Sequence, residues 1–287
     1  MKKMKIIVAL LGGLLFISCQ KLDITFPTTD VNANTAELRV LNVMPLPATT
    51  QNSDTLLLNG IRCSMVSTAI GNYYPLSTPR YFSVPTGNVS VSLNFPTIKT
   101  STTTTPGFVY TGTIANLQQG KWSAYIYNMS QSPFLLQDTE DVPTLDAWAD
   151  TACFIKVANF FYKADGVTPF GPITLKAKKN IAGADWETVA QNVAYQTQSA
   201  TYYKYNLKNT GNAHPWSGAE SNITVAFFDQ NGNQYQQFTN AAGTKGAYSL
   251  GSQSYAKGRV YVYYLSGKEG TTGNADQYIR LNNYAIK

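Results

Sequence analysis

The stretch Val89-Ser-Val-Ser-Leu-Asn-Phe95 decides the fold class, because its apolar and polar residues alternate strictly. Successive side chains of an extended strand point to opposite faces. One face of this segment would therefore carry only Val, Leu and Phe, and the other only Ser and Asn. The alternation predicts a half-buried β-strand with one face on a core and one face in water.

Similar short segments recur, and turn signals separate them. Two Asn-Gly dipeptides predict type I′ hairpin turns, because Asn-Gly most easily adopts the two positive φ angles that this turn requires. The predicted hairpins are Thr55–Leu58 with Ile61–Met65 around Asn59-Gly60, and Ile223–Phe228 with Gln234–Phe238 around Asn231-Gly232. Further predicted strands are Leu38–Met44, Tyr81–Val84, Trp122–Asn128, Cys153–Phe161, Ile173–Ala177, Thr201–Leu207 and Val260–Leu265. The only segment with a helical tendency is a turn near Ala182–Val189, so the chain is predicted to be all-β and built of sandwiches.

The chain also repeats itself. The pattern of Leu38–Val43 matches that of Phe154–Phe160 when Asn42 is aligned with Asn159, an offset of 117 residues. Val89–Leu93 matches Ile223–Phe227 at an offset of 134, and Tyr125 matches Val262 at 137. A growing offset indicates that one unit was duplicated and that the second copy gained loop insertions, chiefly in Lys208–Glu220. We predict two sandwich domains, residues 36–146 and 147–287.

Several of these motifs carry a family resemblance. They are Leu38-Arg-Val-Leu-Asn-Val-Met-Pro45, Leu58-Asn-Gly60, Tyr73-Tyr74, Pro85-Thr-Gly-Asn-Val-Ser-Val91 and Trp122-Ser-Ala-Tyr-Ile-Tyr127. Together they resemble the unit of a bacterial domain-of-unknown-function family, number 4397. The resemblance implies tandem immunoglobulin-like β-sandwiches in a secreted or lipid-anchored protein, and it implies no catalytic residues.

The first residues resemble the leader of a bacterial lipoprotein. Met1–Lys5 is basic, Ile6–Ile17 is apolar and too short to span a bilayer, and Phe16-Ile-Ser-Cys19 resembles a lipobox. By that resemblance residues 1–18 would be removed and Cys19 would carry acyl chains, which hold a protein on a membrane stably. The alternatives are an ordinary secretory signal with an incidental cysteine, or an uncleaved membrane anchor.

Residues 19–35 would form a lipidated tether that separates the folded part from the membrane. Gln20–Asp23 resembles the sorting signals that send lipoproteins of Bacteroidetes to the cell surface. We therefore expect an outer membrane lipoprotein at the cell surface, with the periplasmic face as the alternative.

The composition argues against nucleic acid as a partner. Loss of Lys2, Lys3 and Lys5 with the leader lowers the net charge from +6 to +3, and no basic stripe alternates with aromatic residues. The one local cluster, Lys176-Ala-Lys178-Lys179, is interpreted as a solvated strand end or turn. Charged residues make up 13% of the chain, against about 25% in average domains, which is typical of an extracytoplasmic all-β protein.

The residues that carry chemistry are sparse. Cys63 and Cys153 fall in different predicted domains and are interpreted as two separate, inert thiols, with a cross-domain disulfide as the alternative. A single histidine and no close cysteine pair argue against zinc. The acidic residues are interpreted as a solvated interdomain connection, with weak calcium binding at Asp138–Asp141 as the alternative; they are Asp138, Glu140, Asp141, Asp146 and Asp150. We predict no enzyme, no metal and no cofactor.

Aromatic residues in loops are the candidate ligand contacts, because an aromatic ring can stack on the apolar face of a sugar. The candidates are Tyr73, Tyr74, Trp148, Trp186, His214 and Trp216. The strongest of these is His214-Pro-Trp216, since a long inserted loop is a usual place for binding function. The hypothesis is a surface adhesion or glycan-capture protein, in which Trp216→Ala would abolish binding. The alternative is a structural subunit or spacer of an envelope assembly, bound through strand edges to an envelope protein.

Overall fold

The computed structural model describes residues 34–46, 53–64, 71–75, 81–99, 104–138, 152–207, 222–255, 259–273 and 278–285. Residues 34–287 belong to one compact unit. Cys19, the leader and the predicted domain boundary at residue 147 lie outside the described residues, and so does most of the tether. Within the described ranges no helix is long and apolar enough to cross a membrane.

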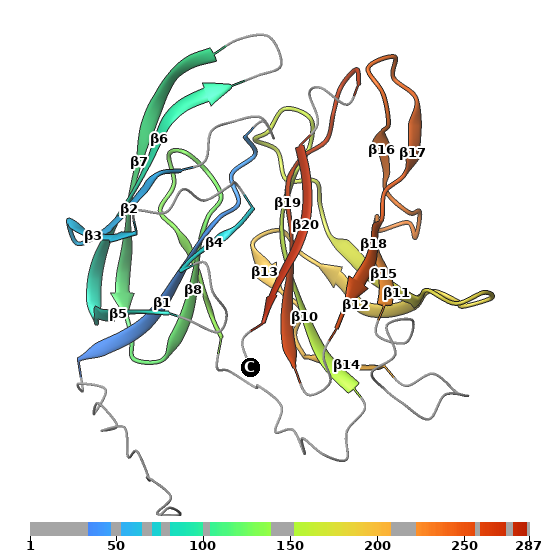
Figure 1. Cartoon of the computed structure of the whole chain (residues 1–287), viewed down its shortest axis with the longest axis horizontal. Coiled ribbons are helices and arrows are strands. Elements are labelled where there is room, and N and C mark those ends of the chain that lie inside the picture. The colour runs from blue at the N-terminus through green and yellow to red at the C-terminus, as the bar shows by residue number, and fades with distance from the viewer. Residues whose placement is uncertain are drawn as a thin grey trace, which may run out of the picture. The chain divides into compact units, whose positions relative to one another are not determined.

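All the regular structure in these ranges is β-strand (Figure 1). The strands are β1 (Thr35–Asn42), β2 (Thr55–Leu58), β3 (Ile61–Ser64), β4 (Tyr73–Tyr74), β5 (Phe82–Pro85), β6 (Gly87–Lys99), β7 (Thr104–Leu117), β8 (Lys121–Ile126), β9 (Phe134–Gln137), β10 (Ala152–Tyr162), β11 (Ile173–Lys179), β12 (Glu187–Val193), β13 (Thr197–Gln198), β14 (Tyr203–Asn206), β15 (Asn222–Phe228), β16 (Gln236–Phe238), β17 (Lys245–Ala247), β18 (Leu250–Ser254), β19 (Val260–Lys268) and β20 (Tyr278–Ala285).

Strands β1 to β9 form a first sandwich of two sheets. Inner sheet I has the order β4-β1-β8-β9, with β5 also paired to β1, and outer sheet I has the order β3-β2-β6-β7. The central strands β1 and β8 are parallel, with Leu38 opposite Trp122 and Asn42 opposite Ile126. The alternating strand Val89–Phe95 lies in β6, where Val89, Val91, Leu93 and Phe95 are buried as predicted.

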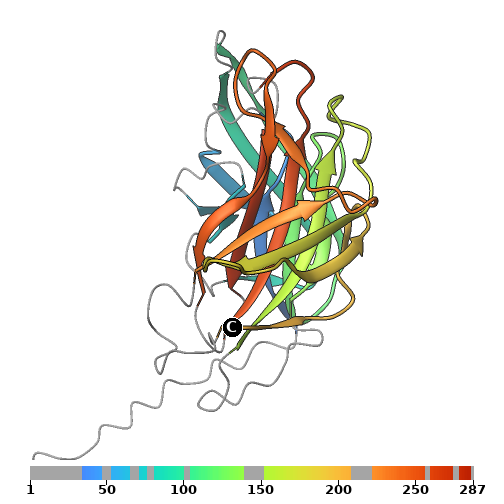
Figure 2. The ribbon, with the colours of Figure 1, turned by 90° about the vertical axis from the view of Figure 1, so that its right-hand side faces the viewer.

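Strands β10 to β20 form a second sandwich with the same connections. Inner sheet II has the order β13-β10-β19-β20, with β14 also paired to β10, and outer sheet II has the order β12-β11-β15-β18. Its central strands β10 and β19 are again parallel, with Asn159 opposite Leu265. The added strands β16 and β17 form a separate two-stranded sheet. In Figure 2 the strands of outer sheet II run across those of inner sheet II. The prediction of an all-β chain with two sandwiches is confirmed.

Equivalent residues of the two sandwiches make the same local contact, and the two sandwiches share one strand order. The side-chain oxygen of Asn42 accepts a hydrogen bond from the Met44 backbone N–H at 3.4 Å, and that of Asn159 accepts one from the Phe161 N–H at 3.1 Å. The offset of 117 residues is therefore correct at this point. The last predicted offset is wrong by two residues. Leu41 pairs with Tyr125 and Ala158 pairs with Tyr264, so Tyr125 corresponds to Tyr264 and not to Val262.

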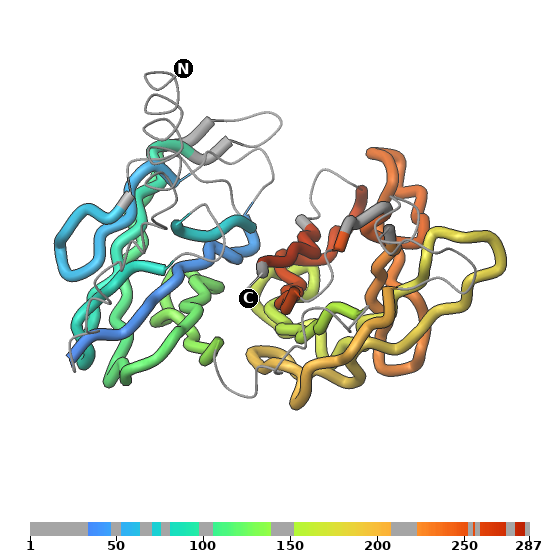
Figure 3. The backbone as a smooth tube through the Cα atoms, turned by 60° about the horizontal axis from the view of Figure 1, so that its bottom comes forward, coloured from blue at the N-terminus to red at the C-terminus, as the bar shows by residue number. Residues whose placement is uncertain are grey.

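Each sandwich has its own core, and a third cluster joins them. The first core lies between β1, β8 and outer sheet I, and the second lies between β10, β19 and outer sheet II. The third cluster fills the space between the two inner sheets; its buried members are Leu41, Val43, Tyr125, Ala158, Phe160, Val260, Val262, Tyr264 and Tyr284. The four sheets are therefore stacked in the order outer I, inner I, inner II and outer II, and the two halves lie side by side in Figure 3.

The parallel pairing of the central strands explains why these residues form the middle of the stack. Parallel strands are usually buried on both faces and have nearly continuous apolar sequences. In β19 the residues Val260 to Gly267 are all buried. In β10 every residue is buried except Phe154, which is partly exposed. Each inner sheet thus contributes one face to its own sandwich core and the other to the third cluster.

The two Asn-Gly turns have different structures. Asn59 and Gly60 have φ angles of 51° and 75° and join β2 to β3, as a type I′ turn requires. At the second turn only Gly232 is left-handed, with φ of 81°. The Asp229 carboxylate accepts hydrogen bonds from the backbone N–H groups of Asn231 and Asn233 and closes this loop. After the turn, Gln234 forms a single bridge with Phe228, and the strand Gln236–Phe238 pairs with β17 instead of β15. The second predicted hairpin is therefore wrong beyond its turn.

Three other segments show features that the local sequence pattern did not indicate. Ala182–Val189 forms a turn only at its start, and β12 begins at Glu187. Thr104 and Thr105 belong to the long strand β7, whose pairing with β6 had not been predicted. Tyr81–Val84 and Val89–Phe95 are strands as predicted, but β5 lies in inner sheet I and β6 in outer sheet I. The single intervening residue, Thr86, therefore carries the chain from one sheet to the other.

Candidate functional site

Tyr74 is a core residue and not a ligand contact. It lies in β4 and none of its surface is exposed. Its hydroxyl lies 2.8 Å from the Ser53 side-chain oxygen and donates to the Ser53 carbonyl at 2.9 Å. The prediction placed Tyr74 in a loop, but pairing of β4 with β1 turns the ring into the first core. A fully buried ring offers no face to a sugar.

Tyr73 lies on the opposite face of β4, between the two sandwiches. Its ring is half-buried and packs against Tyr284 of the second sandwich at 5.9 Å between centroids. The Arg39 guanidinium lies 5.2 Å from the Tyr73 ring centroid, 4.4 Å from that of Tyr81 and 4.5 Å from that of Tyr284. These contacts make Tyr73 part of the junction between the sandwiches.

Trp186 keeps part of its surface exposed. It lies just before β12 and packs edge-on against Phe228, with 5.6 Å between the ring centroids. The Lys178 ammonium lies 4.8 Å from the centroid of its ring. Of the six aromatic candidates, Trp186 is therefore the described residue best placed to contact a ligand. Trp148, His214 and Trp216 lie outside the described residues.

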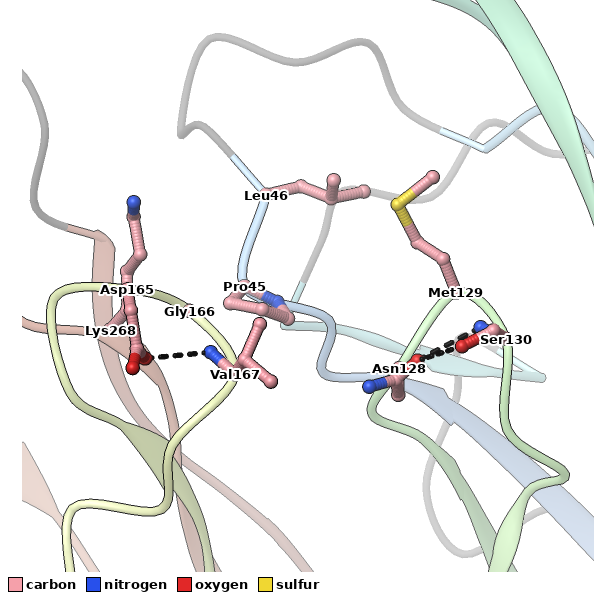
Figure 4. Close-up of a pocket in the computed structure, with 9 residues that line it drawn as sticks. All are labelled: Pro45, Leu46, Asn128, Met129, Ser130, Asp165, Gly166, Val167 and Lys268. Carbon is pink, nitrogen blue, oxygen red and sulfur yellow. Dashed lines mark hydrogen bonds between the residues drawn. The ribbon is translucent and has the colours of Figure 1, made fainter.

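A cleft opens where loops of the two sandwiches meet (Figure 4). Its volume is about 380 Å³, in the lower part of the roughly 300–1,000 Å³ range of small-molecule sites. The lining residues are Pro45, Leu46, Asn128, Met129, Ser130, Asp165, Gly166, Val167 and Lys268. The first five come from the first sandwich and the last four from the second, so neither sandwich alone forms this cleft.

The walls of the cleft are apolar and its rim is polar. Val167 is 71% exposed and Met129 is 51% exposed, and Leu46 and Pro45 lie beside them. The Asn128 side-chain oxygen accepts hydrogen bonds from the Ser130 backbone N–H at 2.9 Å and from its hydroxyl at 3.0 Å. Lys268 donates to the Ala164 carbonyl at 3.2 Å. The arrangement suits a ligand that presents an apolar face and polar edges.

Asp165 shapes the loop that carries Val167. Its carboxylate accepts hydrogen bonds from the Thr168 hydroxyl and from the backbone N–H groups of Val167, at 2.9 Å, and Thr168, at 2.8 Å. The hydrogen bond from the Thr168 hydroxyl, followed by those from the two backbone groups, lowers the pKa of Asp165. The side chain of Val167 is thus presented by a loop that its own hydrogen bonds hold in place.

A buried polar network around Asp138 includes two members of the third cluster, Tyr125 and Tyr284. The Asp138 carboxylate accepts a hydrogen bond from the Ser123 hydroxyl at 2.6 Å and from the Tyr81 hydroxyl at 3.1 Å. The Tyr284 hydroxyl lies 3.3 Å from Asp138 Oδ1, 2.9 Å from Ser123 Oγ and 2.7 Å from the Tyr125 hydroxyl. Tyr284 belongs to the second sandwich and the other four to the first, so the network joins the two.

The charges of this network are Asp138 and Arg39. Burial raises the pKa of Asp138 to about 6, although the Ser123 hydroxyl, the Arg39 charge and the two tyrosine hydroxyls all favour the carboxylate. Arg39 has no exposed surface, and within the described residues none of its three side-chain nitrogens makes a hydrogen bond. The tyrosine rings around it provide cation–π stabilisation instead.

A second polar contact between the sandwiches centres on Gly71. Its carbonyl accepts hydrogen bonds from the Tyr264 hydroxyl and from the Asn282 side-chain amide, the latter at 2.6 Å. Arg280 donates to the Leu46 carbonyl, next to the cleft, at 3.4 Å. Apolar packing and directed hydrogen bonds therefore hold the two walls of the cleft in one arrangement.

The acidic residues and cysteines agree only in part with the predictions from the sequence. Asp138 is buried in the junction rather than solvated, and the other acidic residues of the predicted connection lie outside the described part of the chain. Among the described residues no group of three or more His, Cys, Asp or Glu could hold a metal ion. Cys63 and Cys153 are free thiols, and burial raises the pKa of Cys153 to about 12.

Sequence reasoning missed the cleft and the network. Met129 and Val167 sit in short polar loops, where nothing in the local pattern distinguishes a site from a connection. The sequence does contain one indication of Arg39, which is a charged residue between the apolar residues Leu38 and Val40 of a central strand. Tyr284 lies near the end of the chain in a strand that the pattern had not predicted.

Comparison with known proteins adds little. No protein-family model matches the chain, and no curated protein matches it. Among solved structures the chain is similar to one from Bacteroides eggerthii DSM 20697, described as a "putative cell adhesion protein". The identity is 12%, the match covers 88% of this chain and 96% of that chain, and the TM-score is 0.19. At this TM-score the similarity carries no argument, and the resemblance to family 4397 stays a prediction.

Proposed function

We propose that this chain is a non-catalytic, lipid-anchored binding protein of the bacterial envelope, which captures a glycan in the cleft between its sandwiches. The observation that carries the proposal is the exposure of Met129 and Val167 on facing walls of one cleft. Large apolar side chains are normally buried, and an exposed apolar patch with a polar rim is typical of an interaction site.

The scaffold supports this use of the loops. Binding residues are often carried on loops that a rigid framework positions. Here the third cluster and the Asp138 network join two sandwiches, so a ligand would meet two walls that are already in place. Such preorganisation lowers the entropy lost on binding.

The lipid anchor and the location come from the leader alone. Acylation at Cys19 would place the sandwiches on the outer membrane, and the Gln20–Asp23 patch favours the cell surface over the periplasmic face. An adhesion or glycan-capture role fits such a position, because a surface protein meets glycans directly.

A glycan array tests the cleft. The array would be probed with residues 20–287 and with the double variant Met129→Ser/Val167→Ser. Ile61→Ser is the matched control, because Ile61 is 70% exposed on β3, close to the 71% of Val167, but does not line the cleft. We expect the parent and the control to bind and the double variant to lose binding.

Other outcomes would change the assignment. Binding by all three proteins would contradict the cleft as the site, and loss of binding only in Trp216→Ala would assign it to the inserted loop instead. Binding by none would contradict glycan capture.

A structural role in an envelope assembly is the second candidate. Strand β7 is 14 residues long and lies at the edge of outer sheet I, where in the described part of the chain it pairs only with β6. Val109, on this strand, is 56% exposed. A long free edge can add a strand from another chain. In this case Val109→Lys would reduce self-association in sedimentation experiments, and a parent that stays monomeric at high concentration would count against the idea.

A further inference from the structure

The solvent face of outer sheet II carries two lysines in a fixed setting. Lys176 and Lys178 alternate along β11 with Leu175 and Ala177, which belong to the second core. The two lysine side chains therefore point away from the core, on the same face of the sheet. The sequence alone had suggested only a solvated strand end.

Each ammonium group lies over an aromatic ring. Lys176 Nζ is 4.4 Å from the centroid of the Phe228 ring, and Lys178 Nζ is 4.8 Å from that of the Trp186 ring. The two rings are themselves in contact, at 5.6 Å and nearly perpendicular. We call these four residues the lysine–tryptophan patch.

Neither lysine of the patch forms an ion pair among the described residues. In the described part of the chain no carboxylate lies within 4.0 Å of either ammonium group. The carboxylates of Asp229 and Glu187 keep their negative charges, but their hydrogen bonds direct them elsewhere: Asp229 accepts from the turn that follows β15, and Glu187 accepts from the Tyr203 hydroxyl. The remaining acid next to the patch in sequence is Asp185, which is exposed.

We propose that the lysine–tryptophan patch binds an acidic polysaccharide. Carboxylate groups of the polymer would pair with Lys176 and Lys178, and a sugar ring would pack against the exposed part of Trp186. Aromatic rings attract cations, so Phe228 and Trp186 hold the two ammonium groups in place before the ligand arrives. This site is separate from the cleft and shares none of its lining residues.

The charge pattern distinguishes an acidic from a neutral polysaccharide. A neutral sugar could use the indole but would leave both ammonium groups without a partner. An acidic one uses both features, and its binding weakens as salt rises, because exposed charges are screened over about 10 Å at 0.1 M salt.

The test measures binding of residues 20–287 to polygalacturonate, which carries a carboxylate on each ring, and to neutral dextran. The variants are Lys176→Gln/Lys178→Gln, Trp186→Ala and Trp186→Phe, the last of which keeps a ring against Phe228. Lys245→Gln is the matched control. Lys245 Nζ also lies 4.8 Å from an aromatic centroid, that of Phe238, but it stands outside the patch. Circular dichroism would check that each variant folds.

We expect the parent to bind polygalacturonate and not dextran. The affinity should fall about 3-fold for each lysine removed, as for exposed ion pairs, and about 10-fold for Trp186→Ala. Lys245→Gln should bind as the parent does, and 0.5 M salt should abolish binding. Absence of binding by the parent, equal binding of dextran, or undiminished binding by the double lysine variant would each overturn the proposal. The cleft variant Met129→Ser/Val167→Ser should bind polygalacturonate normally, so the two proposals can fail independently.

Discussion

Replacement of Asp138 by asparagine should change how the stability of the protein depends on pH. Asp138 is 3% exposed, and burial raises the pKa of its carboxyl group from 3.8 to about 6. The folded state therefore holds this proton more tightly than the unfolded state does. Asparagine has nearly the same shape but does not titrate, so the variant lacks this contribution.

The sign follows from the two pKa values. Below pH 3.8 the carboxyl group is protonated in both states, so it does not change the free energy of unfolding. As the pH rises from 3.8 to about 6, only the unfolded state loses its proton, so the free energy of unfolding falls; above pH 6 the loss is complete. A shift of about 2 units at 1.36 kcal/mol per unit makes the full loss about 3 kcal/mol. Of this, about 2 kcal/mol falls between pH 4 and pH 7.

Urea unfolding at pH 4, 5, 6, 7 and 8, followed by tryptophan fluorescence, measures the effect. Asp138→Asn also adds an offset that does not depend on pH, because asparagine does not titrate, and the attraction between ionised Asp138 and Arg39 is already contained in the pKa of about 6. We therefore expect the stability of the variant relative to the parent to rise by about 2 kcal/mol from pH 4 to pH 7. Asp165→Asn is the control, because hydrogen bonds lower the pKa of Asp165, so its contribution has the opposite sign and is lost below pH 4. Parallel pH profiles of Asp138→Asn and parent would refute the reasoning.

Three further predictions concern the junction and the thiols. Phe160→Ala should lower the free energy of unfolding by about 3–5 kcal/mol in urea denaturation, because the ring is fully buried and stacks on Tyr125 at 4.4 Å; a loss below 1 kcal/mol would contradict close packing there. Gly71→Val should lower the melting temperature more than Gly60→Val. Both glycines have positive φ, but a Cβ at Gly71 would lie 2.5 Å from a side-chain carbon of the second sandwich, and nothing lies within 4 Å at Gly60; equal effects would disprove the crowding. In native protein a thiol reagent should modify Cys63 before Cys153, since Cys153 is fully buried with a pKa of about 12; simultaneous labelling would show that β10 opens readily.

The local sequence predicted the elements that depend on near neighbours. The alternation of Val89–Phe95 predicted a half-buried strand, because a two-residue period allows one buried face. Asn59-Gly60 predicted its turn, because few other dipeptides accept two positive φ angles. The match of Asn42 with Asn159 predicted a duplicated unit, and both side chains make the same backbone hydrogen bond.

The same reasoning failed where distant segments decide the outcome. Tyr73 and Tyr74 are adjacent in sequence, yet one enters the first core and the other the junction, because pairing of β4 with β1 sends them to opposite faces. The local sequence indicated two unrelated features, a solvated lysine cluster that includes Lys176 and an aromatic loop residue, Trp186. Only the pairing of β11 with β12 and β15 brings the lysines, Trp186 and Phe228 together.

The sequence by itself determined that this chain is all-β and built of sandwiches, and it predicted that the two halves repeat one pattern. Both properties follow from periods and turn chemistry that act over a few residues. The tertiary structure decided that the two inner sheets pack on each other, that Asp138 and Arg39 are buried there, and that Met129 and Val167 face each other across a cleft. An apolar run such as Val260–Leu265 shows that a strand is buried, but it carries no record of which surface covers its second face. That choice depends on the shapes of two complete sheets.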